Sequence, residues 1–360
     1  MKNAAEDRYN HLLSQILLGR DKGVLNSPDF LSLVATEDEL SAFIEFANLN
    51  HVVVRSLEAV STDAIAGVSE RAALYCATSL ATEKQRISYA ISFLEQISQK
   101  LEAAGCTAVV IKSLDHYPDL GSDLDMFSGG DERQIVAVMA KEFGAQVMPR
   151  SWGDRLAHKW NFSIPGLPEA VEIHVGCLGQ TGEHLGLGRR VSERAMHREL
   201  ECHTFWVAAP EERVMIMTLQ RMYRHFYFRL CDIVDTKNLI EQNQFDYERL
   251  QRAAEPNGIW PGVATFLQVV AEYCQKYGAL LDLPKQVLAG AHSSGKGLVL
   301  KDHFLRIPMV PDAAELFLRQ MAHAGIRTDL RTIGRLSLLP ALAAAALVSY
   351  KVSGDDKGIW

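Results

Sequence analysis

Two aspartates separated by one residue, Asp123 and Asp125, have the types and spacing in this sequence that are best suited to chemistry. They lie at the start of the short run 124–127, which is followed by Ser-Gly-Gly and is typical of a strand. Side chains at positions i and i+2 of a strand point to the same face, so the two carboxylates would lie together. Neighbouring carboxylates repel each other unless a cation or a proton lies between them. Magnesium commonly joins one or two protein carboxylates to substrate phosphates, and the pair therefore predicts a magnesium site.

A third carboxylate, Glu172, occurs in the predicted strand 171–175 and shares a strand face with His174. Three carboxylates can hold two metal ions, one of which activates an attacking oxygen while the other neutralises a leaving group. His174 is expected either to orient a metal ligand or the substrate, or to be a hydrogen-bonded histidine beside the site.

The carboxylates also have a simpler interpretation. Asp123 would then be a turn residue, Asp125 would face solvent, and Glu172 would lie on an exposed strand face. A short motif such as Asp-x-Asp recurs by chance, so its context must decide.

The remaining elements follow from periodicity, and they predict an α+β fold with a small mixed sheet between two helical regions. Helices are expected at 9–18, 37–57, 69–81, 82–104, 131–143, 211–228, 232–241 and 260–277. Strands are expected at 107–111, 124–127, 146–148, 160–164 and 171–175. Thr82 is the expected N-cap of the fourth helix, and Gly105 is its expected stop. We therefore divide the chain into an N-terminal helical region (1–104), an α/β core (105–208) and a C-terminal helical region (209–360).

The composition is that of a globular protein, with 360 residues, 48% hydrophobic and 22% charged. The formal net charge of −7 argues against general nucleic-acid binding, which requires concentrated Lys and Arg. Six scattered cysteines without a CxxC pair predict reduced thiols, with neither a disulfide framework nor a zinc site. The N-terminus lacks the apolar segment of a signal peptide, so we expect a cytoplasmic protein.

An apolar segment at 336–348 is interrupted by Pro340 and is shorter than the roughly 18 residues that span a bilayer. No transmembrane span is therefore predicted. A buried or interfacial helix is expected there instead.

Several segments agree, in order, with those of a known family. They are the helix 94–104, the apolar strand and lysine at 109–113, Tyr117-Pro118, Asp123-Leu-Asp125, Glu172-Ile-His174, and the helical segments 209–215 and 228–235. In these features the chain resembles the uncharacterised bacterial nucleotidyltransferases of the DNA polymerase β type, over about residues 40 to 245. Two positions depart from the family pattern. Lys112-Ser113 replaces Lys-Gly, and an arginine usually found shortly before the Asp-x-Asp strand is absent.

The resemblance implies magnesium-dependent transfer of a nucleoside monophosphate, AMP from ATP in the first instance, to a small-molecule, peptide or protein acceptor. The three carboxylates would be the catalytic and metal-binding residues, with two magnesium ions. Lys112, Ser113 and Ser122 would contact the nucleoside triphosphate, because a small residue at this turn lets the backbone N–H and a hydroxyl approach phosphate. Lys112 is otherwise a solvated lysine at a strand end, and Ser122 otherwise shapes the turn before Asp123.

Four side chains beyond the core, Arg221, Arg224, His225 and Arg229, are further candidates for binding a phosphate or the acceptor. The favoured alternative for Arg229 is a structural ion pair with Asp232 or Asp235. A catalytically silent relative that binds a nucleotide, peptide or partner in the same cleft is the main alternative function, and a tailoring enzyme acting on a peptide or natural product is another.

Two weaker motifs are set aside. The GxxxxGK spacing at 290–296 is followed by Gly297 instead of the Ser or Thr that binds magnesium in a P-loop. His197, Cys202 and His203 lack the remaining ligands of a zinc site.

Overall fold

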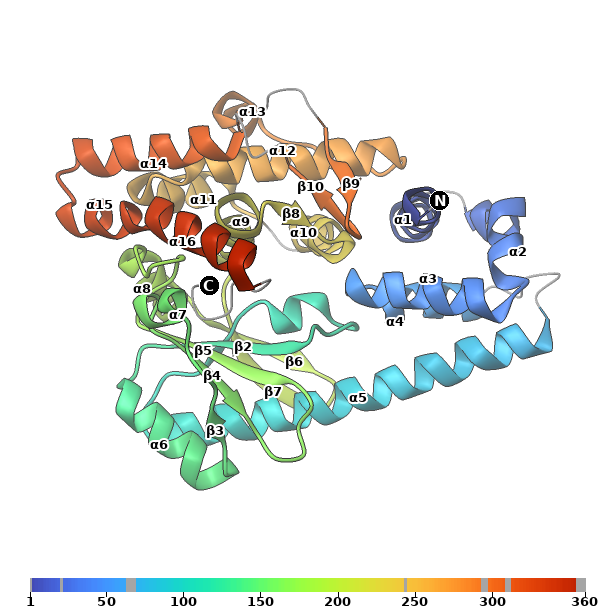
Figure 1. Ribbon diagram of the computed structural model, residues 1–360, viewed down its shortest axis with the longest axis horizontal. Coiled ribbons are helices and arrows are strands. Elements are labelled where there is room, and N and C mark those ends of the chain that lie inside the picture. The colour runs from blue at the N-terminus through green and yellow to red at the C-terminus, as the bar shows by residue number, and fades with distance from the viewer. Residues whose placement is uncertain are drawn as a thin grey trace.

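The computed structural model describes residues 2–19, 22–62, 69–242, 245–292, 297–307 and 312–353. Figure 1 shows helices at both ends of the chain and a sheet between them. The fold is therefore α+β with a seven-stranded mixed sheet, which confirms the predicted class. Of the GxxxxGK motif, residues 293–296 lie outside the described residues, and its first glycine ends a short helix.

Among the described residues, five α-helices precede the sheet: α1 (Lys2–Leu18), α2 (Pro28–Val34), α3 (Glu37–Leu49), α4 (Val53–Thr62) and α5 (Glu70–Ala103). The helix expected at 37–57 is in fact two helices, because the chain turns at Asn50 and at His51, which has a positive φ of 52°. The helices expected at 69–81 and 82–104 are one helix of 34 residues, so Thr82 is an interior residue and the N-cap is Ser69.

The strands of the main sheet lie in the order β3-β4-β5-β2-β1-β7-β6. Their bounds are β1 (Val109–Val110), β2 (Asp123–Ser128), β3 (Gln146–Val147), β4 (Lys159–Ser163), β5 (Ala170–Val175), β6 (Met196–Leu200) and β7 (His203–Val207). β2 pairs in parallel with β5, β1 pairs in parallel with β7, and the other pairs are antiparallel. The β6–β7 hairpin was not among the predicted strands, and it carries His197 and His203.

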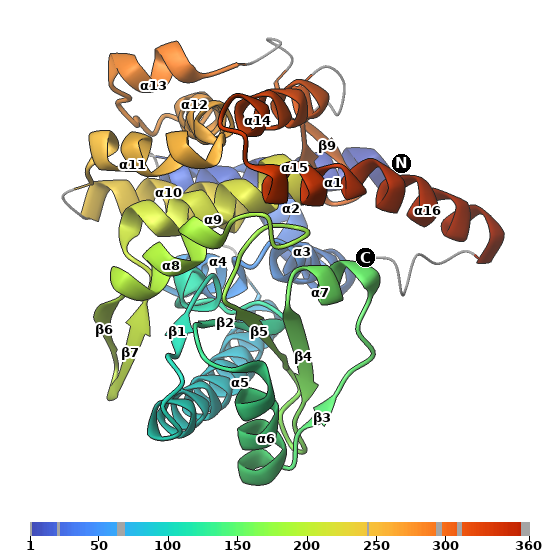
Figure 2. The ribbon, with the colours of Figure 1, turned by 90° about the vertical axis from the view of Figure 1, so that its left-hand side faces the viewer.

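One face of the sheet is covered by α5 and α6 (Glu132–Phe143), as Figures 1 and 2 show. Leu124 and Met126 of β2 and Val171 and Ile173 of β5 are fully buried. Alternation along each strand therefore leaves Asp125 and Glu172 on the opposite face. That face lies toward the second half of the chain (Figure 2).

The second half is mainly helical and carries a small second sheet of order β8-β10-β9. Its helices, with two that lie beside the main sheet, are α7 (Trp152–Leu156), α8 (Leu185–Glu193), α9 (Pro210–Gln220), α10 (Leu230–Gln242), α11 (Tyr247–Ala254), α12 (Trp260–Lys276), α13 (Lys285–Gly290), α14 (Ala314–Ile326), α15 (Leu330–Leu336) and α16 (Leu338–Ser353). The small strands are β8 (Tyr227–Phe228), β9 (Val299–Lys301) and β10 (Phe304–Arg306). The helix expected at 211–228 ends early, because a π-helical turn at Arg221–His225 is followed by Phe226 with a φ of 55° and then by β8.

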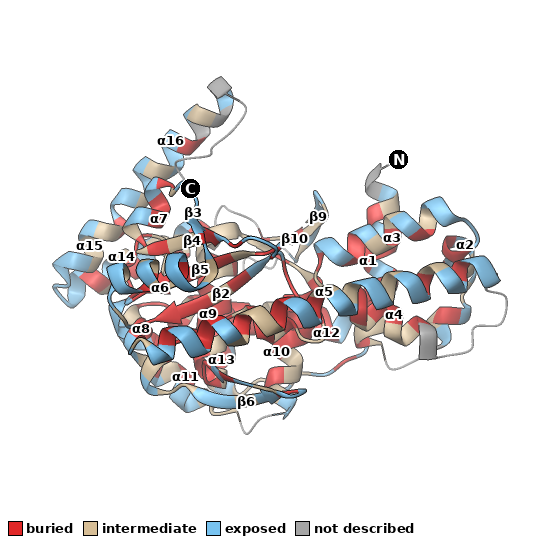
Figure 3. Cartoon of the chain, turned by 90° about the horizontal axis from the view of Figure 1, so that it is seen from below, coloured by how far each residue is buried: buried red, intermediate tan, exposed pale blue. Residues whose placement is uncertain are grey.

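The apolar segment at 336–348 forms most of α16, and Figure 3 shows that helix extending away from the rest of the chain with much of its surface exposed. Pro340 lies in its first turn, where a missing N–H is tolerated. Within the described ranges, none of the helices is long and apolar enough to cross a membrane.

Candidate active site

The register of the two central strands brings the predicted carboxylates together. Asp125 of β2 lies directly opposite Glu172 of β5, and Asp123 lies opposite Ala170. Parallel strands place such partners side by side on one face. The pairing of the strands therefore places Glu172, the third predicted carboxylate, beside Asp125.

Glu172 is surrounded by three donors. Its Oε1 atom accepts from His174 Nε2 at 2.8 Å and lies 3.3 Å from Lys112 Nζ, while Oε2 lies 2.9 Å from Lys159 Nζ. Lys112 also forms an ion pair with Asp125. The expectation of a solvated Lys112 is wrong, because only 12% of its side chain is exposed.

These charges shift the pKa values of the two carboxylates in opposite directions. Burial and the neighbouring charge of Glu172 raise the pKa of Asp125 to about 7, against the opposing effect of Lys112. Burial also opposes ionisation of Glu172, but Lys112, His174 and Lys159 together hold its pKa well below the usual value. Burial lowers the pKa of His174 to about 4, so this histidine is neutral at pH 7 and donates to the Glu172 carboxylate.

Asp123 occupies the exposed end of β2. The carboxyl group itself is partly buried, and this burial, followed by the charge of Glu172, raises the pKa of Asp123. The ligand atoms of Asp125, Glu172 and His174 all lie within 4.8 Å of one another, and Asp123 is not part of that tight group. Asp123 nevertheless lines the same pocket.

The turn residues before β2 form hydrogen bonds with other parts of the protein. Ser113 Oγ accepts from the backbone N–H of Asp125 at 2.7 Å and donates to the carbonyl of Asp123 at 3.2 Å. Arg86 of α5 donates to the carbonyls of Leu120, at 3.1 Å, and Gly121, at 3.4 Å. The Ser113 hydroxyl thus fixes the strand that carries the carboxylates, and the exposed Ser122 borders the pocket.

The carboxylates open onto a cavity of about 190 Å³, which we call the site pocket. Its lining is the following set: His51, Lys112, Ser113, His116, Gly121, Ser122, Asp123, Asp125, Glu172, Gln220, Arg221, Arg224, His225 and Arg229. The four candidates from 221–229 therefore line the same pocket as the carboxylates. A lining that combines carboxylates with guanidinium groups suits a ligand that carries both a cation and phosphates.

The ion pair expected from Arg229 is wrong. Within the described ranges, the Asp232 carboxylate pairs with Arg221 at 2.7 Å and the Asp235 carboxylate pairs with Arg55 at 2.6 Å. Arg229 contributes only its backbone N–H to Asp232, at 2.6 Å, and its guanidinium lies 5.5 Å from the centre of the Phe304 ring. Its side chain is therefore available to the site pocket.

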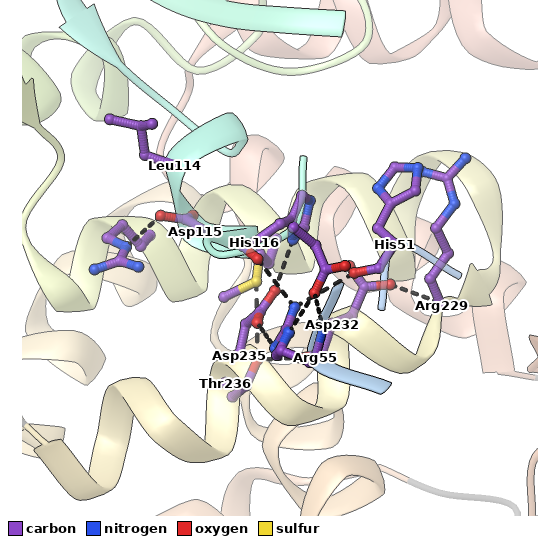
Figure 4. Close-up of polar contacts among 12 residues, drawn as sticks. His51, Arg55, Leu114, Asp115, His116, Arg229, Asp232, Asp235 and Thr236 are labelled. Carbon is purple, nitrogen blue, oxygen red and sulfur yellow. Dashed lines mark hydrogen bonds and ion pairs between the residues drawn. The ribbon is translucent and has the colours of Figure 1, made fainter. Parts of the chain in front are cut away.

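A buried network next to the site pocket was not predicted from the sequence. Arg55 Nε lies 2.7 Å from Asp119 Oδ2, and Arg55 Nη1 lies 2.6 Å from Asp235 Oδ1. His116 Nδ1 lies 2.6 Å from the other oxygen of Asp235. Figure 4 shows Arg55 and His116 converging on Asp235. We call Arg55, Asp119, His116 and Asp235 the Arg55 network; it joins α4, the loop before β2, and α10.

Lys159 is a second residue that the sequence analysis missed. Its ammonium lies between Glu172 and Asp154, 2.8 Å from Asp154 Oδ1. The one available signal was that Lys159 occupies a strand position, where a buried lysine requires an acidic partner. Asp154 is close in the sequence, but Glu172 comes from a neighbouring strand, which the local sequence does not identify.

The donor set meets the requirements of magnesium with one condition. Asp123, Asp125 and Glu172 offer hard carboxylate oxygens, and the bond from His174 orients Glu172 as outer-shell histidines and carboxylates commonly orient each other. Lys112 Nζ contacts both Asp125 and Glu172, so a cation between these carboxylates requires Lys112 to turn away. The flexible side chain of Lys112 allows this movement, and its ammonium group would then bind a triphosphate beside the metal.

We expect magnesium affinity to rise with pH through about 7, because the cation must displace the proton that Asp125 retains below its pKa of about 7. One displaced proton predicts affinity about tenfold higher at pH 8 than at pH 6. Calorimetric titration of magnesium at the two pH values measures this change. In an Asp125→Asn variant, the pH dependence should disappear together with most of the binding. Equal affinity at both pH values in the unaltered protein would contradict the assignment.

The geometry thus combines three carboxylates, Lys112 and three arginines in the lining of one cavity, with Lys159 bound to Glu172 behind it. Such a site can hold a divalent cation together with a polyphosphate. Comparison with family models, with curated proteins and with solved structures finds no match to this chain.

Proposed function

We propose that the chain is a magnesium-dependent nucleotidyltransferase, which transfers a nucleoside monophosphate, AMP from ATP in the first instance, to a small-molecule, peptide or protein acceptor. The observation that carries this proposal is the placement of Asp125 and Glu172 side by side in a pocket that Arg221, Arg224 and Arg229 also line. The pocket therefore supplies both the oxygens that a metal requires and the cations that a triphosphate requires.

The roles of the side chains follow from their surroundings. Asp123 and Asp125 are the metal ligands that face the pocket. Glu172 completes the set, but three donors and a depressed pKa make it a poor base, so we assign it a holding role. Magnesium held by these oxygens would neutralise charge on the phosphates and orient the α-phosphorus for in-line attack. Lys112 and Arg224 bind the pyrophosphate that leaves.

The acceptor is assigned to an adjoining, more apolar cavity of about 480 Å³. Arg224 lines both this cavity and the site pocket, so the two cavities adjoin at that side chain. Phe226, Phe317 and Leu339 contribute apolar surface, and Leu339 belongs to the apolar helix α16. The first turn of α16, the helix that was expected to be buried or interfacial, therefore lines the proposed acceptor site.

Label transfer tests the proposed function directly. The protein is incubated with magnesium, a lysate of the organism that encodes it, and each nucleoside triphosphate labelled on either the α- or the γ-phosphate. Transfer of the α-label alone supports nucleotidyl transfer, whereas transfer of the γ-label alone indicates phosphoryl transfer and overturns the proposal. A labelled small molecule or a labelled protein then identifies the acceptor class.

A catalytically silent nucleotide-binding protein is the second candidate, and the ion pairs of Lys112 with Asp125 and Glu172 favour it. In that case the lysine permanently replaces the cation. Binding of a nucleoside triphosphate that does not depend on magnesium, without any label transfer, would support this function.

Replacing Arg224 with alanine should raise the KM for the nucleoside triphosphate roughly 10- to 100-fold, because a hydrogen bond to a charged group contributes about 1.5–3 kcal/mol. Steady-state kinetics at saturating magnesium measures the effect. Arg252→Ala is the matched control, because the Arg252 side chain is 69% exposed on α11, away from the site pocket. Equal KM values for the two variants would remove Arg224 from triphosphate binding.

A further inference from the structure

A second group of metal-ligating side chains lies at the site pocket. The ligand atoms of His51, His116 and Cys231 all lie within 4.8 Å of one another. His51 comes from the junction of α3 and α4, His116 from the turn before β2, and Cys231 from the first turn of α10. The three residues are far apart in the sequence, so no spacing motif predicts that they lie together.

The backbone places His51 in this group in an uncommon conformation. His51 has a φ of 52°, a left-handed conformation that a histidine adopts only at a cost. The preceding residue, Asn50, accepts a hydrogen bond from the backbone N–H of Leu230 at its side-chain Oδ1 atom, at 3.1 Å, and one from the N–H of Cys231 at its carbonyl, at 3.2 Å. The junction that carries His51 is therefore fastened to the helix that carries Cys231.

The loop before β2 makes room for the His51 ring. A Cβ atom on Gly121 would lie 2.9 Å from Cε1 of His51, closer than real Cβ contacts. The rings of His51 and His116 lie edge to face, with centroids 5.3 Å apart. This glycine permits the close approach that brings the two imidazoles together.

One nitrogen of His51 has no protein partner. The Nδ1 atom is buried and neither accepts nor donates a hydrogen bond within the described part of the chain. A buried polar atom without a partner is rare in folded proteins and calls for an explanation such as an ion or water. Here two further ligand side chains lie beside it.

His116 is oriented as a metal ligand commonly is. Its Nδ1 bonds to Asp235 at 2.6 Å, and Asp235 is itself held by Arg55. A carboxylate that binds one imidazole nitrogen fixes the ring and leaves the other nitrogen for a metal. Cys231 is fully buried, where a thiolate requires a compensating charge.

The local charges are consistent with a divalent cation. Asp119 and Asp235 carry two negative charges when ionised, and Arg55 supplies one positive charge. A divalent ion bound to one thiolate adds one net positive charge, which balances the set. Imidazole and thiolate are ligands that zinc prefers over magnesium.

We propose that His51, His116 and Cys231 bind one transition-metal ion of the zinc class, with the fourth position open toward the site pocket. Both histidines line that pocket. The bound ion joins the α3–α4 junction, the loop before β2, and α10. This site is independent of nucleotidyl transfer and of the magnesium site.

The test uses the full-length protein, freed of metal and then titrated with cobalt(II), which reports a metal–thiolate bond by its charge-transfer absorption. We expect one thiolate-bound cobalt per chain, displaced by zinc. Cys231→Ser should abolish the thiolate band. Cys274→Ser is the matched control, because Cys274 is equally buried in α12, and it should keep the band. Asp125→Asn should also keep it, which separates this site from the carboxylates.

A His51→Asn variant makes the test independent of the loss of the thiol. Asparagine tolerates the left-handed conformation, so the turn is preserved while the imidazole is lost. We expect cobalt affinity to fall at least tenfold in this variant. The absence of a thiolate band in the unaltered protein, or a band that persists in Cys231→Ser, overturns the proposal. Equal cobalt affinity in His51→Asn and the unaltered protein also overturns it.

Discussion

Replacing Asp125 with asparagine is expected to lower nucleotidyl transfer by more than about 100-fold, beyond the loss that is typical when an outer-shell partner of a metal is removed. The change replaces one carboxylate oxygen of the proposed metal site with an amide nitrogen, without changing the shape of the side chain. Transfer is measured with the acceptor that α-labelling identifies. Without that acceptor, magnesium-dependent release of pyrophosphate from the triphosphate gives the readout.

The fold should survive this substitution. The raised pKa of Asp125, about 7, means that its neutral form is well tolerated in the folded chain, and asparagine is neutral. Circular dichroism and the unfolding midpoint should therefore match those of the unaltered protein. Asp38→Asn, on the exposed surface of α3, is the matched control and should keep full activity. An Asp125→Asn variant with normal turnover would exclude the proposed mechanism.

Replacing Arg55 with methionine should lower the free energy of unfolding by about 3–5 kcal/mol, the usual cost of breaking a buried ion pair by removing one partner. Arg55 is 13% exposed and contacts two carboxylates, Asp119 and Asp235, whose side chains are almost fully buried. Methionine replaces much of the volume of the arginine stem, so the effect reports the lost charge. The midpoint and slope of urea unfolding measure the change.

The matched control for this prediction is Arg71→Met. Arg71 pairs with Glu37 at the surface, and 83% of its side chain is exposed. An exposed pair of this kind contributes at most about 1 kcal/mol. If the Arg55 variant unfolded at the same urea concentration as the Arg71 variant, the Arg55 network would not be a source of stability.

The parts of the fold that sequence analysis anticipated depend on short-range periodicity. Asp123 and Asp125 could be assigned to one face of their strand, and Glu172 and His174 to one face of theirs, because alternation along a strand is a local property. The strands at 124–127 and 171–175 are confirmed as β2 and β5 on the same grounds. Their pairing in parallel, which brings Asp125 beside Glu172, is a tertiary property that the alternation does not contain.

Two of the differences concern where helices begin and end. Thr82 has the side chain of an N-cap, yet α5 continues through it, because the segment 70–103 contains neither Gly nor Pro to end the helix before it. The break between α3 and α4 has no Gly or Pro to mark it. It is fixed instead by Asn50, whose side chain bonds to Leu230 of α10.

The Arg55 network was inaccessible for the same reason. Its members carry ordinary charged side chains with no motif, and they become partners only when α4, the loop before β2, and α10 meet. Arg229 shows the converse. Its sequence neighbours Asp232 and Asp235 suggested a local pair, but more distant arginines occupy both carboxylates.

The order of the Arg55 network along the chain also bears on synthesis. Arg55 and Asp119 leave the ribosome well before Asp235, so the nascent chain carries this arginine with one of its two acidic partners missing. The N-terminal helices and the central strands of the sheet are complete by then, and Arg55 can already pair with Asp119, but Arg55 and His116 still lack Asp235. During vectorial folding the Arg55 network is therefore completed only when α10 docks, and an interruption of translation before that helix leaves Arg55 without its second acidic partner.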